Sequence, residues 1–455
     1  MKDNNRGTFS GKVGFVLAAA GASVGLGNIW RFPYLAAKYG GGIFLLVYII
    51  LAMTFGYSMI VAETAIGRMT GKSPVGAYTT FGKSRAFRFG GWINAIIPLL
   101  IVPYYSVIGG WVIRYLVGYI CGQSSELAAD GYFSSFISNG ASSEICFLIY
   151  AGLTLAIIFA GVENGIERVS KIMMPILVVL SVIVVVYSVT RPGALEGVKY
   201  FLVPNLEHFS WMTVVSAMGQ MFYSLSIAMG ILITFGSYMK KNISIENSTR
   251  NVEFFDTAIA IMAGMMVIPS VFAFSGGNPD ALNAGPSLMF ITIPKVFDSM
   301  EFGTFIGLLF FLLVLFAALT SSIALAESAA STFQDELRWS REKSTVVVGI
   351  IMVILGTLSS LGYGPLGNIT IIGMQFLDFF DFLTNSVMMP IAAIATCLLV
   401  SRTVGMERIE HEMLLEGGTF RRKKIFIAMI KYVCPIFAAI ILISSVANAF
   451  GIISM

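Results

Sequence analysis

Apolar stretches that are long enough to cross a lipid bilayer recur along almost the whole chain. A membrane-spanning helix needs about 20 mostly apolar residues. Runs that can reach this length lie at 12–37, 42–69, 88–121, 144–162, 167–190, 211–239, 252–277, 304–334, 344–361, 369–399 and 425–453. Only 12% of the residues are charged, whereas soluble domains carry about 25%. We therefore predict an all-α polytopic membrane protein with eleven transmembrane helices in a single domain, 1–455.

The distribution of basic residues predicts the orientation in the membrane. Cytoplasmic loops carry an excess of Lys and Arg. If the N-terminus is cytoplasmic, most of the 29 basic residues fall on the inner side. An odd number of spans then leaves the C-terminus outside. The net charge of +4 thus reflects topology, and we expect the lipid bilayer as a partner and no nucleic acid.

The first span is interrupted near its middle by the segment Gly21-Ala-Ser-Val-Gly-Leu-Gly-Asn-Ile-Trp-Arg31. Glycine in a helix interior costs about 1 kcal/mol relative to Ala. In hydrocarbon, backbone groups released from a helix need partners in the protein, in water or in a ligand. A helix broken at mid-membrane offers carbonyl oxygens to a cation and amides to an anion, as transporters do.

The sixth span is interrupted in a similar way by Ser224-Leu-Ser-Ile-Ala-Met-Gly230. Small residues of this kind also promote packing between membrane helices, and for one segment alone that explanation is the simpler one. Two interruptions five spans apart instead favour an inverted five-plus-five repeat with a binding site between the breaks. The repeats would cover about 12–190 and 211–399, and 425–453 would be an accessory helix.

Three motifs resemble one transporter family. They are Gly25-Leu-Gly-Asn-Ile-Trp-Arg-Phe-Pro33, Gln220-Met-Phe-Tyr-Ser-Leu-Ser226 and Leu319-Thr-Ser-Ser322. In order and spacing they are similar to the first, sixth and eighth helices of the neurotransmitter:sodium symporter family, and they resemble its bacterial amino-acid branch most. The resemblance implies a LeuT-like fold with broken helices 1 and 6. It also implies sodium-coupled amino-acid import through the bacterial plasma membrane by alternating access, and no enzymatic activity.

The same resemblance implies two sodium sites made of oxygen ligands, which hard cations prefer. The first would use Ser23, Asn28, Ser224 and Asp256, and the second Gly21, Val24, Ala317, Thr320 and Ser321. Taken alone, Thr320-Ser321-Ser322 is weak evidence for a site, because Ser and Thr often bond back to their own helix.

Asp256 departs from the family pattern, which has an Asn at this position. One helical turn further on, chloride-dependent members have a Ser where this chain has Ala260. A fixed carboxylate would supply the negative charge that chloride supplies elsewhere, so we predict no chloride requirement. The alternative is that Asp256 pairs with Arg250 or caps its helix. An acid inside the membrane is by default a candidate functional residue.

The substrate class follows from Gly25, where monoamine carriers of the family have an Asp. Without that acid, the charge balance suits an α-carboxylate and therefore an L-amino acid. By resemblance, the substrate site comprises Ala22, Ser23, Gly25, Leu26, Gly27, Ile101, Tyr105, Phe222, Tyr223, Ser224, Ser226, Met229, Ser321 and Leu325. No side chain among them is charged, so charged substrates should be rejected. We expect a large hydrophobic or aromatic amino acid such as Tyr, Trp, Phe or Leu.

Two gates are also implied by the resemblance. Arg31 and Asp381 would face each other on the outer side, with Tyr105 and Phe222 as an apolar lid. On the inner side Arg6 would pair with Asp335, near Tyr238. Phe9 would act as a plug, although the family usually has Trp at this position. Partly exposed ion pairs contribute only about 0–1 kcal/mol, so such gates can open.

Several alternatives remain open at the level of sequence. Broken helices with carbonyl sites also occur in ion channels, and a protein of this kind could bind an amino acid without moving it. Cys121 and Cys146 flank one outer loop and either pair or remain free thiols. We expect a monomer or a weak oligomer.

Overall fold

Helices make up nearly the whole molecule. The computed structural model describes residues 7–276 and 286–450. The first half contains α1 (Lys12–Ser23), α2 (Phe32–Lys38), α3 (Gly42–Leu51), α4 (Tyr57–Thr70), α5 (Pro74–Phe81), α6 (Arg85–Ile120), α7 (Ser124–Leu127), α8 (Tyr132–Ser138), α9 (Gly140–Phe159), α10 (Arg168–Val189) and α11 (Ala194–Leu202). The second half contains α12 (Trp211–Ser224), α13 (Ile231–Ser237), α14 (Ile245–Ser275), α15 (Ile293–Asp298), α16 (Gly303–Leu337), α17 (Arg341–Leu361), α18 (Phe376–Asp381), α19 (Met389–Leu399), α20 (Met406–Leu414), α21 (Lys423–Ala428) and α22 (Cys434–Ala449).

Short turns of other helical types join several of these helices into longer rods. The π-helical turns are η1 (Gly27–Arg31), η2 (Ala52–Gly56), η3 (Val162–Glu167), η6 (Leu288–Thr292), η7 (Phe382–Met388), η8 (Val400–Val404) and η10 (Met429–Val433). The 3₁₀ turns are η4 (Leu206–His208) and η9 (Leu415–Gly417). Single π-helical turns inside helices occur frequently at functional sites, and η1 lies within the break that the sequence predicts.

Within the described residues, nine helical rods are long and apolar enough to cross a membrane, and ten if the bent pair Lys12–Ser23 and Gly27–Lys38 counts as one span. That pair is bent by 52° at its break. In place of the predicted sixth span the structure has two short helices, α12 and α13, which the non-helical segment 225–230 separates. Neither half is long enough to span a membrane alone.

The two breaks differ in backbone conformation. After α1, the chain becomes extended at Val24, where φ is −75° and ψ is 100°. Between α12 and α13, Ser226, Ala228 and Gly230 all have positive φ. Such conformations cost about 1–3 kcal/mol each for residues other than Gly and persist only where the surrounding structure holds them. The second break is therefore the more strained of the two.

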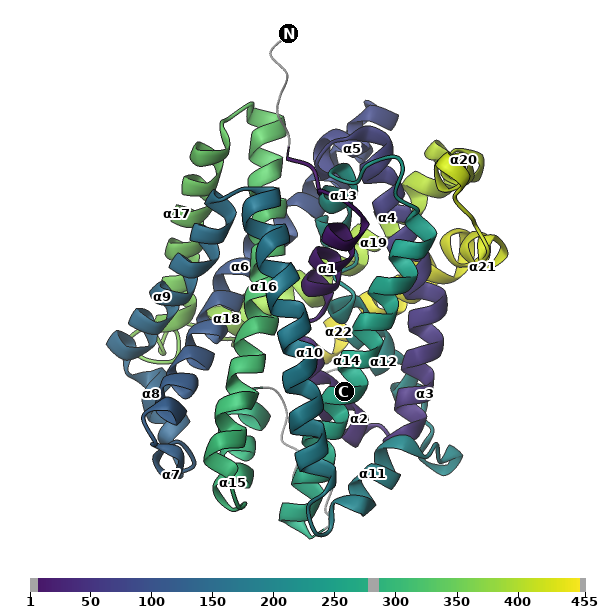
Figure 1. Cartoon of the computed structure of the whole chain (residues 1–455). Helices are drawn as coiled ribbons and strands as arrows, with labels where there is room; N and C mark the ends of the chain where they lie inside the picture. Colours follow the sequence, from purple (N-terminus) through teal and green to yellow (C-terminus); the bar gives the residue numbers. More distant parts are fainter. Residues whose placement is uncertain (1–6, 277–285, 451–455) are drawn as a thin grey trace.

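The elements at the two ends of the bundle divide clearly (Figure 1). Helices α5, α13 and α20 lie at one end, which we call the α5/α20 end, and α7, α11 and α15 lie at the other, the α11/α15 end. Lys295 on α15 pairs with the exposed Asp130 and holds the pKa of that carboxyl below its usual range. This ion pair joins α15 to the α7–α8 segment.

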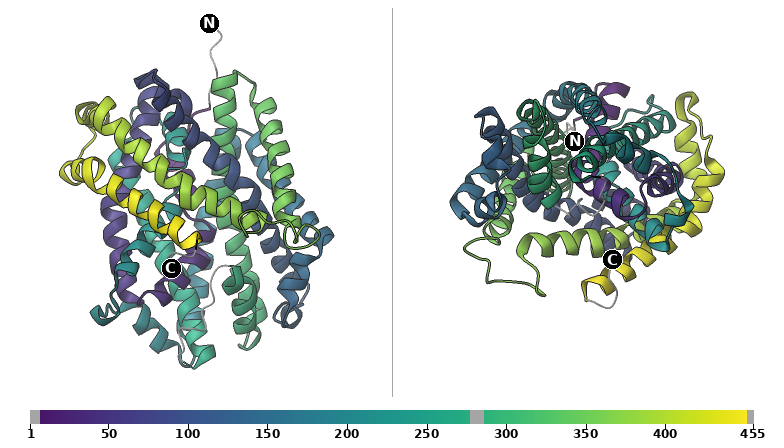
Figure 2. Two further views of the ribbon diagram at one scale, coloured as in Figure 1. Left: turned by 180° about the vertical axis from the view of Figure 1, so that it is seen from behind. Right: turned by 90° about the horizontal axis from the view of Figure 1, so that it is seen from below.

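The longest helices form the centre, and α19 and α22 cover one face. Helices α6 and α16 pack against each other, and α1 packs on both α14 and α16. Figure 2 shows α19 and α22 side by side along the face opposite to that seen in Figure 1. All four cysteines are free thiols, so the possible pair Cys121–Cys146 does not form.

Candidate functional site

Polar side chains from three helices meet at the centre of the molecule, where the two breaks face each other. Asn28 of η1 donates through Nδ2 to Ser224 Oγ at 2.8 Å and to Asp256 Oδ1 at 2.9 Å. Ser224 donates to the same carboxylate oxygen at 2.7 Å. All three side chains are buried. Because Asp256 lies mid-way along α14 and contacts these groups, the alternative in which it pairs with Arg250 or caps the helix is wrong.

Tyr48 completes this cluster. Its hydroxyl donates to Asp256 Oδ2 at 2.8 Å and lies 3.1 Å from Ser224 Oγ. The residue is fully buried on α3. The sequence analysis did not identify it, because a single Tyr within an apolar run resembles a packed aromatic. The only available signal was a hydroxyl in a stretch, 43–51, that is otherwise apolar.

Tyr48→Phe tests whether this cluster is the first sodium site that the sequence predicts, in which case sodium binding should weaken by about 10- to 100-fold. The substitution removes a hydrogen bond to a charged group, which contributes about 1.5–3 kcal/mol, and every 1.4 kcal/mol is a factor of ten. The sodium dependence of uptake or of substrate binding measures the effect. Tyr119→Phe is the matched control, since the buried Tyr119 hydroxyl has no hydrogen-bond partner among residues 7–276 and 286–450. Equal effects of the two substitutions would contradict the assignment of Tyr48 to the sodium site.

A second group of oxygen atoms lies between α1 and α16. Ser321 Oγ is 3.2 Å from each of the carbonyl oxygens of Gly21, Ala22 and Val24. Thr320 is the preceding residue of α16, and its hydroxyl donates to the Phe316 and Ala317 carbonyls of its own helix at 3.0 and 3.1 Å. The break after α1 thus directs three backbone carbonyls at the Ser321 hydroxyl. These atoms are the ligand type that a hard monovalent or divalent cation prefers.

A small cavity lies between the two oxygen clusters. Its volume is about 20 Å³. The lining residues come from both breaks and from α6 and α16: Ala22, Ser23, Gly25, Gly27, Asn28, Ile101, Tyr105, Tyr223, Ser224, Ser226, Met229, Ser321 and Leu325. No charged side chain is among them. Every one of these positions is a site residue expected from the sequence.

Two residues expected in the substrate site do not line the cavity. Phe222 packs its ring against Phe55, with 5.1 Å between centroids, and lines a separate cavity together with Arg31. Successive residues on a helix point about 100° apart, so Tyr223 and not Phe222 covers the central cavity. Leu26 contributes its backbone, since its N–H donates to the Tyr105 hydroxyl at 3.1 Å. That amide is therefore already bonded rather than free.

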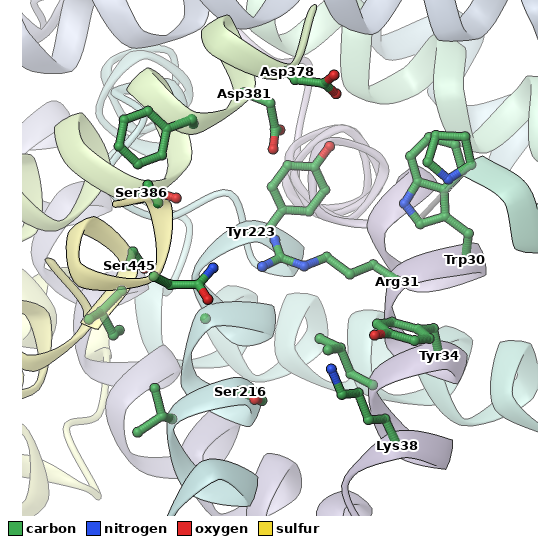
Figure 3. Close-up of a pocket in the computed structure, with 18 of the residues that line it drawn as sticks. Trp30, Arg31, Tyr34, Lys38, Ser216, Tyr223, Asp378, Asp381, Ser386 and Ser445 are labelled. Atoms are coloured by element: carbon green, nitrogen blue, oxygen red, sulfur yellow. The ribbon is translucent and has the colours of Figure 1, made fainter. Parts of the chain in front are cut away.

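A large cavity that is open to solvent lies on the side of Tyr223 that faces the α11/α15 end. Its volume is about 460 Å³, and Arg31, Asp381 and Tyr223 are among the residues that line it. Figure 3 shows Arg31 and Asp381 both pointing toward Tyr223. The Arg31 guanidinium lies 5.5 Å from the centre of the Tyr223 ring, and Asp381 accepts from Tyr104 at 3.2 Å. Among the described residues, Arg31 and Asp381 form no direct ion pair. Tyr223 lines both this cavity and the central one, so it is the barrier between them.

The opposite side of the central cavity is closed by aromatic packing. Phe9 is fully buried, and its ring contacts Phe15, Phe235 and Tyr238 edge to face at 5.6–6.1 Å between centroids. The Phe9 N–H donates to the Tyr238 carbonyl at 3.2 Å. Phe9 thus has the position of a plug. Arg6, the expected partner of Asp335, lies outside the described residues, and Asp335 accepts from the Ser73 N–H at 2.6 Å.

A buried ion pair that the sequence analysis missed lies behind the plug. The Tyr238 hydroxyl donates to Glu327 at 2.8 Å, and Arg341 pairs with the same carboxylate at 2.6 Å. Glu327 belongs to α16 and Arg341 begins α17, so they connect the plug to neighbouring helices. The signal in the sequence was an acid, Glu327, within the apolar run 304–334.

Phe9→Ala is expected to open the α5/α20 end. Truncating a buried Phe costs about 3–5 kcal/mol, and here that cost falls on the closed state. Labelling of a Ser237→Cys probe by a polar thiol reagent should rise at least tenfold, in a background that lacks the exposed Cys121. Phe44→Ala, which removes an equally buried ring from α3, should destabilise the protein without raising the labelling. Unchanged labelling in Phe9→Ala would show that Phe9 is not a plug.

Comparison with known proteins identifies the family. The model of the sodium:neurotransmitter symporter family matches residues 6–127 and 133–452. An uncharacterized sodium-dependent transporter, YhdH of Bacillus subtilis, is 33% identical over the whole of both chains. An uncharacterized sodium-dependent transporter of Haemophilus influenzae is 32% identical over 98% of this chain and all of its own. The crystal structure of MhsT in complex with L-phenylalanine superposes with a TM-score of 0.87 and 35% identity, over 97% of this chain and 100% of that one.

The arrangement of spanning helices around two breaks, together with these matches, defines a membrane transporter. The chain belongs to the sodium:neurotransmitter symporter family. It is a multi-pass membrane transporter with the fold of MhsT, and it is not an enzyme.

Proposed function

We propose that this protein is a symporter that uses a sodium gradient to import a neutral, hydrophobic L-amino acid. The observation that carries the proposal is the uncharged central cavity, with an oxygen cluster on each side of it. The sodium-dependent relatives and the phenylalanine-bound structure of MhsT support it.

One sodium ion would bind at Asn28, Ser224, Asp256 and the Ser23 carbonyl. The second would bind among the carbonyls of Gly21, Val24 and Ala317 and the hydroxyls of Thr320 and Ser321. Both sites border the substrate cavity, because Ser23, Asn28, Ser224 and Ser321 line it. Each ion then raises the affinity for substrate and the substrate raises the affinity for ions, since such coupling is reciprocal.

The substrate's α-carboxylate would lie near Gly25, Gly27 and the Tyr105 hydroxyl. Its amino group would meet the carbonyls around Ser23 and Tyr223 and the Ser226 hydroxyl. The side chain would lie among Ile101, Met229 and Leu325. Met adapts its shape readily, so we expect the site to widen around several large apolar or aromatic side chains. A charged side chain would be buried without a partner and therefore excluded.

Transport would be independent of chloride, because Asp256 already provides a negative charge beside the first sodium site. Its carboxylate is bonded to Asn28, Ser224 and Tyr48 and lies within 3 Å of each. If uptake stops when chloride is replaced by gluconate, this part of the proposal is wrong.

Alternating access would come from movement of the helices that carry the breaks. The chain would cross a bacterial inner membrane eleven times, with α12 and α13 as the two halves of the sixth span. The α5/α20 end would be cytoplasmic and the α11/α15 end outside. The large cavity on the α11/α15 side of Tyr223 would then open to the outside, and Tyr223 and Phe9 would close the central site on its outer and inner sides.

Uptake into proteoliposomes tests the proposal. Labelled L-tyrosine, L-tryptophan, L-phenylalanine, L-leucine and L-alanine are offered with an inward sodium gradient, and in parallel with potassium in place of sodium. Saturable, sodium-dependent accumulation is expected for the large apolar substrates. Binding without accumulation would instead support a receptor, and flux without saturation would support a channel.

A further inference from the structure

A further cavity lies at the periphery of the helix bundle and shares no lining residue with the central cavity. Its volume is about 340 Å³, and it lies between α5, the start of α6, α19 and η8. Its walls include Tyr78, Phe87, Phe89, Ile391, Leu398 and Arg402. Phe89 is 59% exposed and Leu398 41%, so the groove opens sideways toward the surroundings of the bundle.

The floor of the groove is apolar because its polar atoms are already bonded inward. The Tyr78 hydroxyl is hydrogen-bonded to Thr396 at 2.8 Å and to Asn94 at 3.2 Å, and Tyr78 lines the groove. Gly90 allows this close packing, since a Cβ atom there would lie 2.6 Å from the Tyr78 ring and 3.3 Å from Ala395 Cβ. The groove is therefore built into the packing of α5, α6 and α19.

The length of the groove fits one leaflet of a bilayer. From Ile391 to Arg402 the chain rises about 16 Å, at 1.5 Å per helical residue. The hydrocarbon core of a bilayer is about 30 Å thick, so the groove covers about half of it. In Figure 2, α19 runs along the face of the bundle. One acyl chain therefore matches the groove in both polarity and length.

Cationic groups gather at the α5/α20 end of the groove. Arg402 lines that end, and Arg85 and Arg88 lie at the start of α6 next to the wall residue Phe87. All three side chains are exposed. Within the described residues none of them forms a side-chain hydrogen bond or an ion pair. Each basic residue near a membrane surface raises the affinity for anionic lipid about fivefold.

We propose that this groove binds an anionic phospholipid, with one acyl chain along α19 and the phosphate at Arg402, Arg85 and Arg88. The proposal rests on the membrane orientation given above and is independent of the transported substrate. The Asn94 backbone packs close to Gly230, and the Asn94 side chain donates to Tyr78, so two residues would separate the lipid from the break before α13.

Native mass spectrometry of the full-length protein in detergent tests the proposal. The probes are phosphatidylglycerol and phosphatidylcholine with identical acyl chains. The expected result is that phosphatidylglycerol binds at least fivefold more tightly, and that Arg402→Gln weakens its binding about fivefold. Arg408→Gln removes one exposed charge from the neighbouring α20 and should change nothing.

A second variant locates the acyl chain. Ala395→Phe fills the groove and should reduce the binding of phosphatidylglycerol, while sodium-dependent uptake reports that the protein is folded. Equal binding of the two lipids, or equal effects of Arg402→Gln and Arg408→Gln, would overturn the proposal. So would full binding to a folded Ala395→Phe variant. Failure of amino-acid uptake in the unmodified protein would count against the proposed function but not against this lipid site.

Discussion

Gly25→Ala is expected to reduce amino-acid uptake by about 100-fold. A Cβ atom at this position would lie 2.7 Å from Ser321 Oγ and 2.9 Å from the Tyr105 hydroxyl. Neither neighbour can move freely, because Ser321 is within hydrogen-bond distance of three carbonyls and Tyr105 is bonded to the Leu26 N–H. Overpacking of this kind costs about 1–3 kcal/mol. In addition, the new methyl group would occupy space that we assign to the substrate carboxylate.

Substrate affinity is measured by binding and by uptake. A glycine that has room for a methyl group serves as the control. In the part of the chain that the structure describes, no atom outside the adjoining backbone of α9 lies within 4 Å of a Cβ added at Gly152, so Gly152→Ala should leave both quantities unchanged. Thermal unfolding of the two variants separates a local effect on the site from general instability. A Gly25→Ala protein that transports normally would show that the carboxylate does not bind beside this residue.

Much of the fold could be predicted because its signals are local. The length of the apolar runs gives the spanning helices, and the glycines between Gly21 and Gly27 give the break after α1. The sixth span was harder. Its composition indicates an interruption, but only the backbone shows six residues, 225–230, outside any helix, with positive φ at Ser226 and Ala228. Such strain depends on packing by other helices, which no local pattern records.

The candidate site shows the same division between local and non-local information. The residues that line the central cavity lie on short motifs, so their grouping could be predicted from resemblance. The error at Phe222 concerns the direction of one side chain near an irregular segment, where a helical period cannot be extended with certainty. Tyr48 and the pair Glu327–Arg341 were missed because each acts through partners that are distant in the sequence.

Asp256→Asn is expected to abolish sodium-dependent uptake at ordinary sodium concentrations. The carboxylate is fully buried and accepts hydrogen bonds from Asn28, Ser224 and Tyr48. Removing one partner from a buried charged group costs about 3–5 kcal/mol, which corresponds to a loss of sodium affinity of about 100-fold or more. The sodium concentration at half-maximal uptake, or a sodium-dependent binding signal, measures the loss. Glu196→Gln removes an exposed acid of α11 and should have no effect.

The same variant tests why the protein would need no chloride. If the Asp256 charge replaces a chloride ion, then Asp256→Asn combined with Ala260→Ser should recover uptake in chloride but not in gluconate. Ala260 is buried on α14, one turn from Asp256, so the new hydroxyl would face the same cluster. Recovery in both media would mean that a negative charge is not needed there. No recovery in either medium, from a folded protein, would mean that Asp256 acts as a sodium ligand whose geometry an anion cannot replace.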